Sequence, residues 1–463
     1  MIVEKMDCLF SARARRILIP ASIFSGLFCL LLVRYSQDDS LKILWLYAMY
    51  ACIMFLVVLY KNFLSKYEIA IFCFLGVQLL ASAPFPDDMN GLTVTAYLLS
   101  YRYGVSSRSF VATIVDFFTQ GGFVSKYFVW HFIFAGTVFL SFVISVCIGT
   151  AIRKAKDDMK YFLLLASLLW VSAFTSPSAY FLNCNFGRVE IFAQIILFVA
   201  MLIIRKPTIR WLVPLLAVIV MATHLILVFF YIPLIGILLL HELLKNEKPH
   251  KRDILLFIAT AKTILAIFIA YLLFGRGTFI FDDARSFYEY LSAKTDLIIG
   301  EWELHMTMFA SLEDHLVHWR NRVSLGFHGN WTVLMSMPLV SLFVAFWLKC
   351  FRTEVTKTMK LFFLLPILAL LYQAVAFFIF FDFGRWMTMV INVQFMTLFY
   401  LAMVKNRTVL SVAQAITPFV KRHAFFVVLA CLLMAFLGPV DVIGPTVHRG
   451  TSTFPVLRLF FGM

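Results

Sequence analysis

The chain has 463 residues, of which 62% are hydrophobic and only 14% are charged, and its mean hydropathy is +0.90. This apolar content excludes an ordinary soluble domain and predicts a polytopic membrane protein, with the lipid bilayer as its solvent. The formal net charge is +15. Loops on the predicted cytoplasmic side carry most of this charge, so nucleic acid is not a predicted partner.

The apolar runs are long and continuous, which favours helices over a barrel. We predict an all-α transmembrane bundle that forms one integral membrane domain over residues 1–463, with about 11 full spans and one broken helical hairpin. The predicted spans are residues 17–33, 41–60, 70–82, 127–152, 161–174, 189–204, 254–274, 331–348, 361–381, 386–404 and 424–437.

The apolar run from Trp211 to Leu240 is too long for one span. Pro214, His224 and Pro233 interrupt it, and we predict a pair of short helices that enters the membrane and returns.

Charge gives the predicted orientation. We assign Arg13, Arg15 and Arg16 to the cytoplasm and let successive spans cross the membrane in alternating directions. This places about 25 of the 40 Lys and Arg residues in short inner loops. The N-terminus is then cytoplasmic and the C-terminus is outside. We interpret the first apolar segment as a signal anchor and not as a cleaved signal peptide.

Two large loops, residues 83–126 and 275–330, are predicted on the outer face, where such long loops usually carry function. The first loop begins with Pro-Phe-Pro and the acidic pair Asp87 and Asp88, and two interfacial helices follow. The first of these helices is predicted to end near Tyr101, just before Arg102, and Ser106, Ser107 and Arg108 are predicted to cap the second. A solvated turn is the usual role of such a pair.

The tripeptide Phe-Gly-Arg occurs three times, with its arginines at Arg188, Arg276 and Arg385. Arg188 and Arg385 begin spans that run inward, so guanidinium and helix N-terminus are predicted to bind one phosphate. Arg276 ends an outward span, and we interpret it as a snorkelling terminal residue. Asp382 and Glu190 are predicted to support these arginines. The alternative is that the tripeptide only ends helices.

The acidic pair after a span, the interfacial helices and the arginines at span ends together resemble the C-type fold glycosyltransferases and related bacterial lipid-linked polysaccharide polymerases. The resemblance implies a sugar donor on polyprenyl phosphate or diphosphate, Asp87 or Asp88 as the catalytic base, and a bacterial inner-membrane location. It also implies other glycan-assembly proteins as candidate partners. The predicted phosphate ligands are Arg188, Arg385, Lys262, Arg102 and Arg108.

Lys262 lies in the middle of a predicted span, where a charge costs about 2.5 to 3.5 kcal/mol. We therefore expect it to face the bundle interior or a cavity, with snorkelling as the alternative. In the second outer loop, Asp314, His315 and His318 form a candidate divalent-metal site, although a solvated helix surface is more usual. No other cofactor is predicted.

The leading hypothesis is thus an outer-face glycosyltransferase or polymerase that assembles an envelope glycan. A transporter or flippase of lipid-linked glycan is the alternative, because broken helices often form substrate sites in transporters. A membrane acyltransferase with His131 or His224 as its catalytic residue is a third reading.

Overall fold

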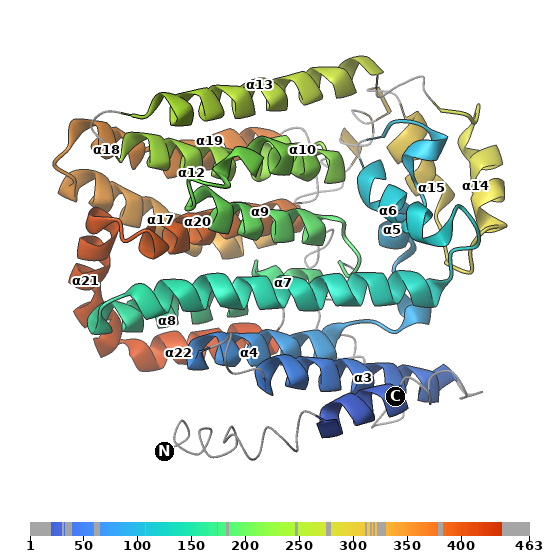
Figure 1. The fold of residues 1–463 in the computed structure, drawn as a ribbon, viewed down its shortest axis with the longest axis horizontal. Helices are drawn as coiled ribbons and strands as arrows, with labels where there is room; N and C mark the ends of the chain where they lie inside the picture. The colour runs from blue at the N-terminus through green and yellow to red at the C-terminus, as the bar shows by residue number, and fades with distance from the viewer. Residues whose placement is uncertain are drawn as a thin grey trace.

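The structure is a computed structural model, shown in Figure 1, and the part of the chain that it describes is all-α. The described residues are 20–29, 32, 39–59, 65–106, 108–173, 175–181, 185–245, 249–274, 279–310, 313–314, 317, 320–321, 330–377 and 383–437. Long helices run side by side through most of the molecule, and shorter helices gather at one end (Figure 1).

Within the described residues, five helical segments are long and apolar enough to cross a membrane, or six if α21 and α22 count as one bent span. They are residues 126–154, 227–244, 251–273, 357–374 and 384–403. The prediction of about 11 full spans is therefore wrong. Some predicted spans form shorter helices: α9 (Glu190–Ile204) has 15 residues, or roughly 22 Å, against a hydrocarbon thickness of about 30 Å.

In the first half of the chain, longer helices precede and follow a segment of short helices. Its principal elements are α3 (Asp39–Leu59), α4 (Lys66–Ser82), η1 (Pro86–Asp88), α5 (Gly91–Val94), α6 (Ser109–Thr119), α7 (Lys126–Lys154), α8 (Asp157–Ser172), α9, α10 (Val213–Thr223), α11 (Leu227–Phe230) and α12 (Ile232–Leu244).

The second half contains another segment of short helices between two long ones. Its principal elements are α13 (Lys251–Phe274), α14 (Ala284–Ser292), α15 (Glu301–Leu304), α17 (Asn330–Thr353), α18 (Lys357–Phe362), α19 (Leu365–Phe377), α20 (Phe383–Met403), α21 (Arg407–Arg422) and α22 (Ala424–Leu437).

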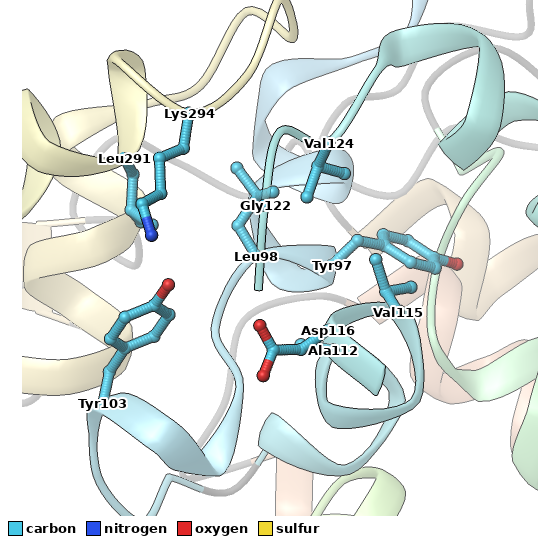
Figure 2. A pocket seen from close by; sticks show the side chains of 10 residues that line it. All are labelled: Tyr97, Leu98, Tyr103, Ala112, Val115, Asp116, Gly122, Val124, Leu291 and Lys294. Atoms are coloured by element: carbon cyan, nitrogen blue, oxygen red, sulfur yellow. The ribbon is translucent and has the colours of Figure 1, made fainter. Parts of the chain in front are cut away.

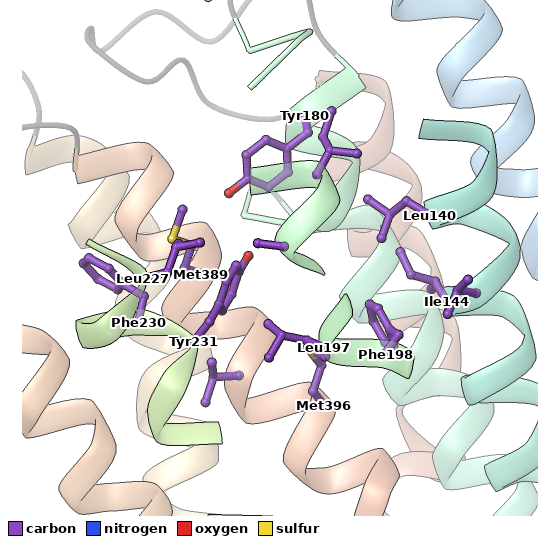
Figure 3. Close-up of a cluster of buried hydrophobic side chains, with 14 of the residues drawn as sticks. Leu140, Ile144, Tyr180, Leu197, Phe198, Leu227, Phe230, Tyr231, Met389 and Met396 are labelled. Carbon is purple, nitrogen blue, oxygen red and sulfur yellow. The ribbon is translucent and has the colours of Figure 1, made fainter. Parts of the chain in front are cut away.

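Helix α20 forms the centre of the bundle, since every residue of its Gly384–Met403 segment is buried. It packs against α7, α12, α17 and α19. Figure 3 shows Leu140 and Ile144, Leu197 and Phe198, and Met389 and Met396 contributed to this core by three different helices. Close packing of this kind holds helices together where lipid removes the hydrophobic driving force.

The predicted break in the run from Trp211 to Leu240 is confirmed at His224. Helix α10 ends at Thr223, and His224 has extended backbone angles of φ −165° and ψ 118°. Pro214 and Pro233 lie in the first turns of α10 and α12, where a missing N–H costs nothing. The prolines therefore begin helices here, and the polar interruption at His224 separates them.

The two segments of short helices, residues 84–125 and 279–310, pack together at one end of the bundle, and we call them the cap (Figure 1). Val124 N donates to Lys294 O at 2.8 Å, Ile280 N to Tyr103 O at 3.2 Å, and Gly300 N to Thr95 Oγ1 at 3.2 Å. A cavity of about 20 Å³ remains between the segments, and Figure 2 shows Tyr103, Asp116 and Lys294 around it.

Helix α21 was not predicted from the sequence. It bends 84° away from α22 and lies across the end of the bundle opposite the cap (Figure 1). The Asn406 side chain caps its first turn by accepting a hydrogen bond from Val409 N at 3.1 Å. One of its faces packs against α8 and α17 while the other carries polar residues, and such a helix lacks the continuous apolar run that identifies a span.

The structure allows a direct test of membrane orientation. In a cysteine-free background, Asp88→Cys in the cap should react with a membrane-impermeant maleimide added outside intact cells. Val355→Cys lies at the opposite end, is 94% exposed, and should react only after permeabilisation. Equal reactivity of both positions from one side would contradict a bundle that crosses the membrane between them.

Candidate functional site

Three arginines from different parts of the chain meet where the cap joins the bundle. A cavity of about 10 Å³ is lined by Thr93, Ala96, Arg108, Arg188, Val189, Glu190 and Arg385. We call Arg108, Arg188, Glu190, His224 and Arg385 the cap-end cluster. The cavity is close to the size needed for one water molecule, so the cluster is closed in this conformation.

Glu190 lies at the centre of the cap-end cluster. Its carboxylate is 1% exposed, and its Oε1 atom is 2.9 Å from His224 Nδ1 and 3.5 Å from Arg385 Nη1. Its Oε2 atom has no hydrogen-bond partner in the described part of the chain. One oxygen is thus held by protein groups, while the other can accept a hydrogen bond from a ligand.

The contacts of His224 define its protonation. Arg108 Nε donates to His224 Nε2 at 3.2 Å, so Nε2 must carry a lone pair. The ring proton is then on Nδ1 and is donated to Glu190 Oε1, which makes the imidazole neutral. His224 lies in the turn after α10, outside the candidate spans, and burial followed by the charge of Arg108 lowers its pKa. Both observations agree on neutral His224 at pH 7.

Glycine explains how Arg188 reaches the cluster. Gly187 has φ +94°, a left-handed backbone conformation that residues with a side chain rarely adopt. An added Cβ would also lie 2.9 Å from Ile133 Cδ1. Phe186 before it is fully buried, and its carbonyl accepts a hydrogen bond from Thr93 Oγ1 at 3.0 Å. This turn delivers Arg188 just before α9 begins.

The other described copy of the tripeptide has a different backbone conformation. Phe383, Gly384 and Arg385 form the first turn of α20, and Gly384 has no positive φ. Arg385 is 4.1 Å from the centroid of the Trp386 ring, which stacks on Phe230 with ring centroids 4.8 Å apart. Packing on an aromatic face holds a planar guanidinium in one orientation.

A second buried ionic cluster at the opposite end of the bundle provides a contrast. Arg210 binds Glu242 at 2.6 Å and Asp253 at 2.9 Å, and Lys245 also binds Glu242 at 2.6 Å. Two cations thus meet two carboxylates, and Tyr400 donates a further hydrogen bond to Glu242 at 2.9 Å. The positive and negative charges of this network are equal in number, and they are paired with one another. The network therefore links helix ends and leaves no excess charge to attract a ligand.

The cap-end cluster is not balanced in this way. The described residues around its cavity carry three guanidinium groups against one carboxylate, and its histidine is neutral. Helices α9 and α20 both begin beside the cluster, so the positive ends of two helix dipoles add to the same field. An electropositive, buried cavity is a physical basis for anion binding.

Buried polar side chains continue from the cluster into the bundle. Gln194 lies one turn below Glu190 on α9, and Trp170 Nε1 donates to Asn392 Oδ1 at 2.8 Å. Figure 3 shows Tyr180 and Tyr231 with their hydroxyl ends turned toward one another. All of these side chains are at most 1% exposed, and they give the region below the cluster a polar interior.

The structure brings together only some of the predicted site residues. Arg188, Arg385, Arg108 and Glu190 share one cavity. Glu190 pairs with Arg385 at 3.5 Å and lines the same cavity as Arg188, which lies two residues before it and precedes α9. Asp382 and Arg276 lie outside the described residues.

The other predicted ligands lie elsewhere. Asp87 is exposed and forms an ion pair with Lys126, and Asp88 is exposed next to it. Arg102 is half-exposed on the cap surface and pairs with Asp116 at 3.3 Å. Lys262 is exposed on α13, so the prediction that it faces the bundle interior is wrong.

The metal prediction is only partly covered by the structure. Asp314 is described and exposed, whereas His315 and His318 lie outside the described residues. No group of three or more metal-ligating side chains occurs among the described residues.

Sequence reasoning missed the pairing of His224 with Glu190. The available signal was a single polar residue at the break of a long apolar run, because an uncompensated imidazole is costly there and implies a partner. Nothing in the local sequence identified that partner, which is 34 residues away.

Comparison of the chain with protein-family models, with curated proteins and with solved structures gives no match.

Proposed function

We propose that this protein is a membrane glycosyltransferase or polymerase that uses a sugar linked to polyprenyl phosphate or diphosphate, with the cap-end cluster as its phosphate site. The observation that carries the proposal is the convergence of Arg108, Arg188 and Arg385 on one buried cavity. Planar guanidinium groups bind phosphate oxygens through paired hydrogen bonds. The long apolar helices fit a substrate that is itself a lipid.

The chemistry requires two kinds of group, and the cluster contains both. In sugar transfer an acceptor hydroxyl oxygen forms a bond to the anomeric carbon, while the bond from that carbon to the phosphate oxygen breaks. The electron pair of the broken bond leaves with the phosphate, whose charge the three arginines would stabilise. The proton of the acceptor hydroxyl would pass to Glu190 Oε2, the oxygen without a protein partner in the described residues.

Glu190 is a better candidate base than Asp87 or Asp88 on the geometry. A base must lie within hydrogen-bond reach of the reacting hydroxyl, close to the leaving phosphate. Glu190 lines the same cavity as the three arginines, whereas neither aspartate does. Asp87 is instead engaged by Lys126 on an exposed surface.

Substrate binding must open the cluster, because its cavity is far smaller than a sugar phosphate. Three parts of the chain line the cavity: the cap with Arg108, the start of α9 with Arg188 and Glu190, and the start of α20 with Arg385. Displacing the cap from the bundle would separate Arg108 from His224 and widen the cavity. Closure around the phosphate would then exclude water from the reacting centre.

The test is a transfer assay with purified protein in proteoliposomes. A polyprenyl-linked radiolabelled sugar and a lipid-linked glycan acceptor should give an elongated product and release unglycosylated polyprenyl phosphate or diphosphate. No transfer with either donor class, although the donor binds, would overturn the proposed reaction and leave an anion-binding role.

A transporter or flippase is the second candidate, and the helix break at His224 favours it. Discontinuous helices often form substrate sites in transporters, and this break contributes directly to the cluster. The same proteoliposomes separate the two functions, since a flippase would move the lipid-linked sugar between leaflets without changing it chemically.

A further inference from the structure

Helix α13 presents to lipid a face that also carries a charged residue. It is one of the five candidate spans, and only 6% of its most apolar stretch is buried against the rest of the chain. Its contacts are confined to one side, where α10 and α12 pack against it (Figure 1). On the opposite, exposed face it carries Lys262, which forms no ion pair within the described residues.

Lys262 is too far from both helix ends to reach water by itself. It lies 11 residues after Lys251 and 12 before Phe274, or roughly 16 to 18 Å from either end at 1.5 Å per residue. A lysine side chain with its four-carbon stem reaches only about 6 Å. A charge at this depth normally faces another polar group inside a protein.

The surface around Lys262 suits a close helix partner. Ala259 and Ala266 lie within one turn on either side and share its exposed face at a spacing of seven residues. Leu255, Ile258, Leu265 and Ile269 complete the face, and all are exposed. Small residues flanking a polar one allow two helix backbones to approach and a hydrogen bond to form between them.

We propose that the Lys262 face of α13 is the docking surface for a transmembrane helix of a partner protein that carries an aspartate or glutamate at mid-membrane depth. The inference is independent of the cap-end cluster and of the reaction proposed for it. Charge complementarity is the argument for this occupant, because a carboxylate would neutralise Lys262 where neither lipid tails nor water can.

A second copy of this chain fits the face poorly. Two α13 helices packed about a two-fold axis would place one Lys262 against the other, and like charges repel strongly at low dielectric. Within the five candidate spans of the described chain, the acidic residues are Glu242 and Asp253, and Arg210 engages both. No described span therefore offers a carboxylate to Lys262.

The test is site-specific photo-crosslinking of the full-length protein in its native membrane. A photoreactive amino acid at Ala266 should give an adduct with a second protein, whose crosslinked peptide contains Asp or Glu within an apolar run. The same group at Leu368, an exposed residue of the candidate span that includes α19, is the matched control and should give no such adduct. Lys262→Leu should lower the adduct yield at least tenfold, whereas Lys262→Arg should retain it.

Charge reversal completes the test. Lys262→Glu should also lose the adduct, and replacing the partner's acidic residue with lysine should restore it. Lys262→Leu makes the span more apolar, so its insertion and expression should match those of the parent protein. Adducts with lipid alone, adducts between two copies of this chain, or unchanged yield in Lys262→Leu would each overturn the proposal.

Discussion

Glu190→Gln should lower sugar transfer at least about 100-fold while leaving anion binding intact or stronger. The amide cannot accept the acceptor's proton, so turnover should be lost. It also removes the one carboxylate beside three guanidinium groups, so the cavity should attract a phosphate more strongly. The measurements are transfer in proteoliposomes and binding of the polyprenyl-linked donor to the purified variant.

A structural role for Glu190 would give a different result. Loss of one partner from a buried ion pair typically costs about 3 to 5 kcal/mol, and a variant damaged only in this way would lose binding and turnover together. Glu68→Gln is the matched control, because Glu68 is also 1% exposed and pairs with Arg153 at 2.9 Å but does not line the cavity. Full transfer by Glu190→Gln would exclude Glu190 as the base, and Asp87 and Asp88 would then be the carboxylates to replace.

Arg188→Lys and Arg385→Lys should each reduce transfer by about 10²- to 10³-fold, the usual effect of removing a group that stabilises transition-state charge. Lysine keeps the positive charge but lacks the planar fork that binds two phosphate oxygens. At Arg385 it also loses the close stacking on Trp386. The readout is kcat and KM for the polyprenyl-linked donor, measured for each variant beside its thermal stability.

Arg102→Lys is the matched control for these exchanges. Arg102 is half-exposed on the cap and pairs with Asp116, and lysine can form an exposed ion pair of similar, small energy. Its transfer activity should remain close to that of the parent protein. If Arg188→Lys and Arg385→Lys are tolerated as well as Arg102→Lys, the recurrent Phe-Gly-Arg tripeptide only marks helix ends, and the phosphate-site proposal fails.

The amino-acid sequence alone determined the all-α fold class and several local features. High apolar content and continuous apolar runs predicted the all-α fold, because a backbone in lipid must satisfy its own hydrogen bonds. The break at His224 was predictable from a polar residue between two prolines. Arg188 and Arg385 could be chosen because a charged residue at the end of an apolar run is conspicuous, and Arg108 because it stands at the predicted start of an interfacial helix.

Only the tertiary structure decided how many helices are long enough to span and which charged residues meet. An apolar run shows that a segment is shielded from water, but it does not show whether protein or lipid shields it. The 15-residue helix α9 therefore looked like a full span in the sequence. Likewise, Lys262 looked like an interior residue because the sequence does not show which side of α13 its neighbours cover.

The pairing of Glu190 with His224 and Arg385 joins residues 34 and 195 positions apart. Such contacts follow from the packing of α9 against α10 and from the start of α20 lying at the same level of the bundle, and helix periodicity carries no information about that level. The sequence therefore supplied the charges, and the packing of the helices and the cap determined that Arg108, Arg188 and Arg385 surround a single carboxylate.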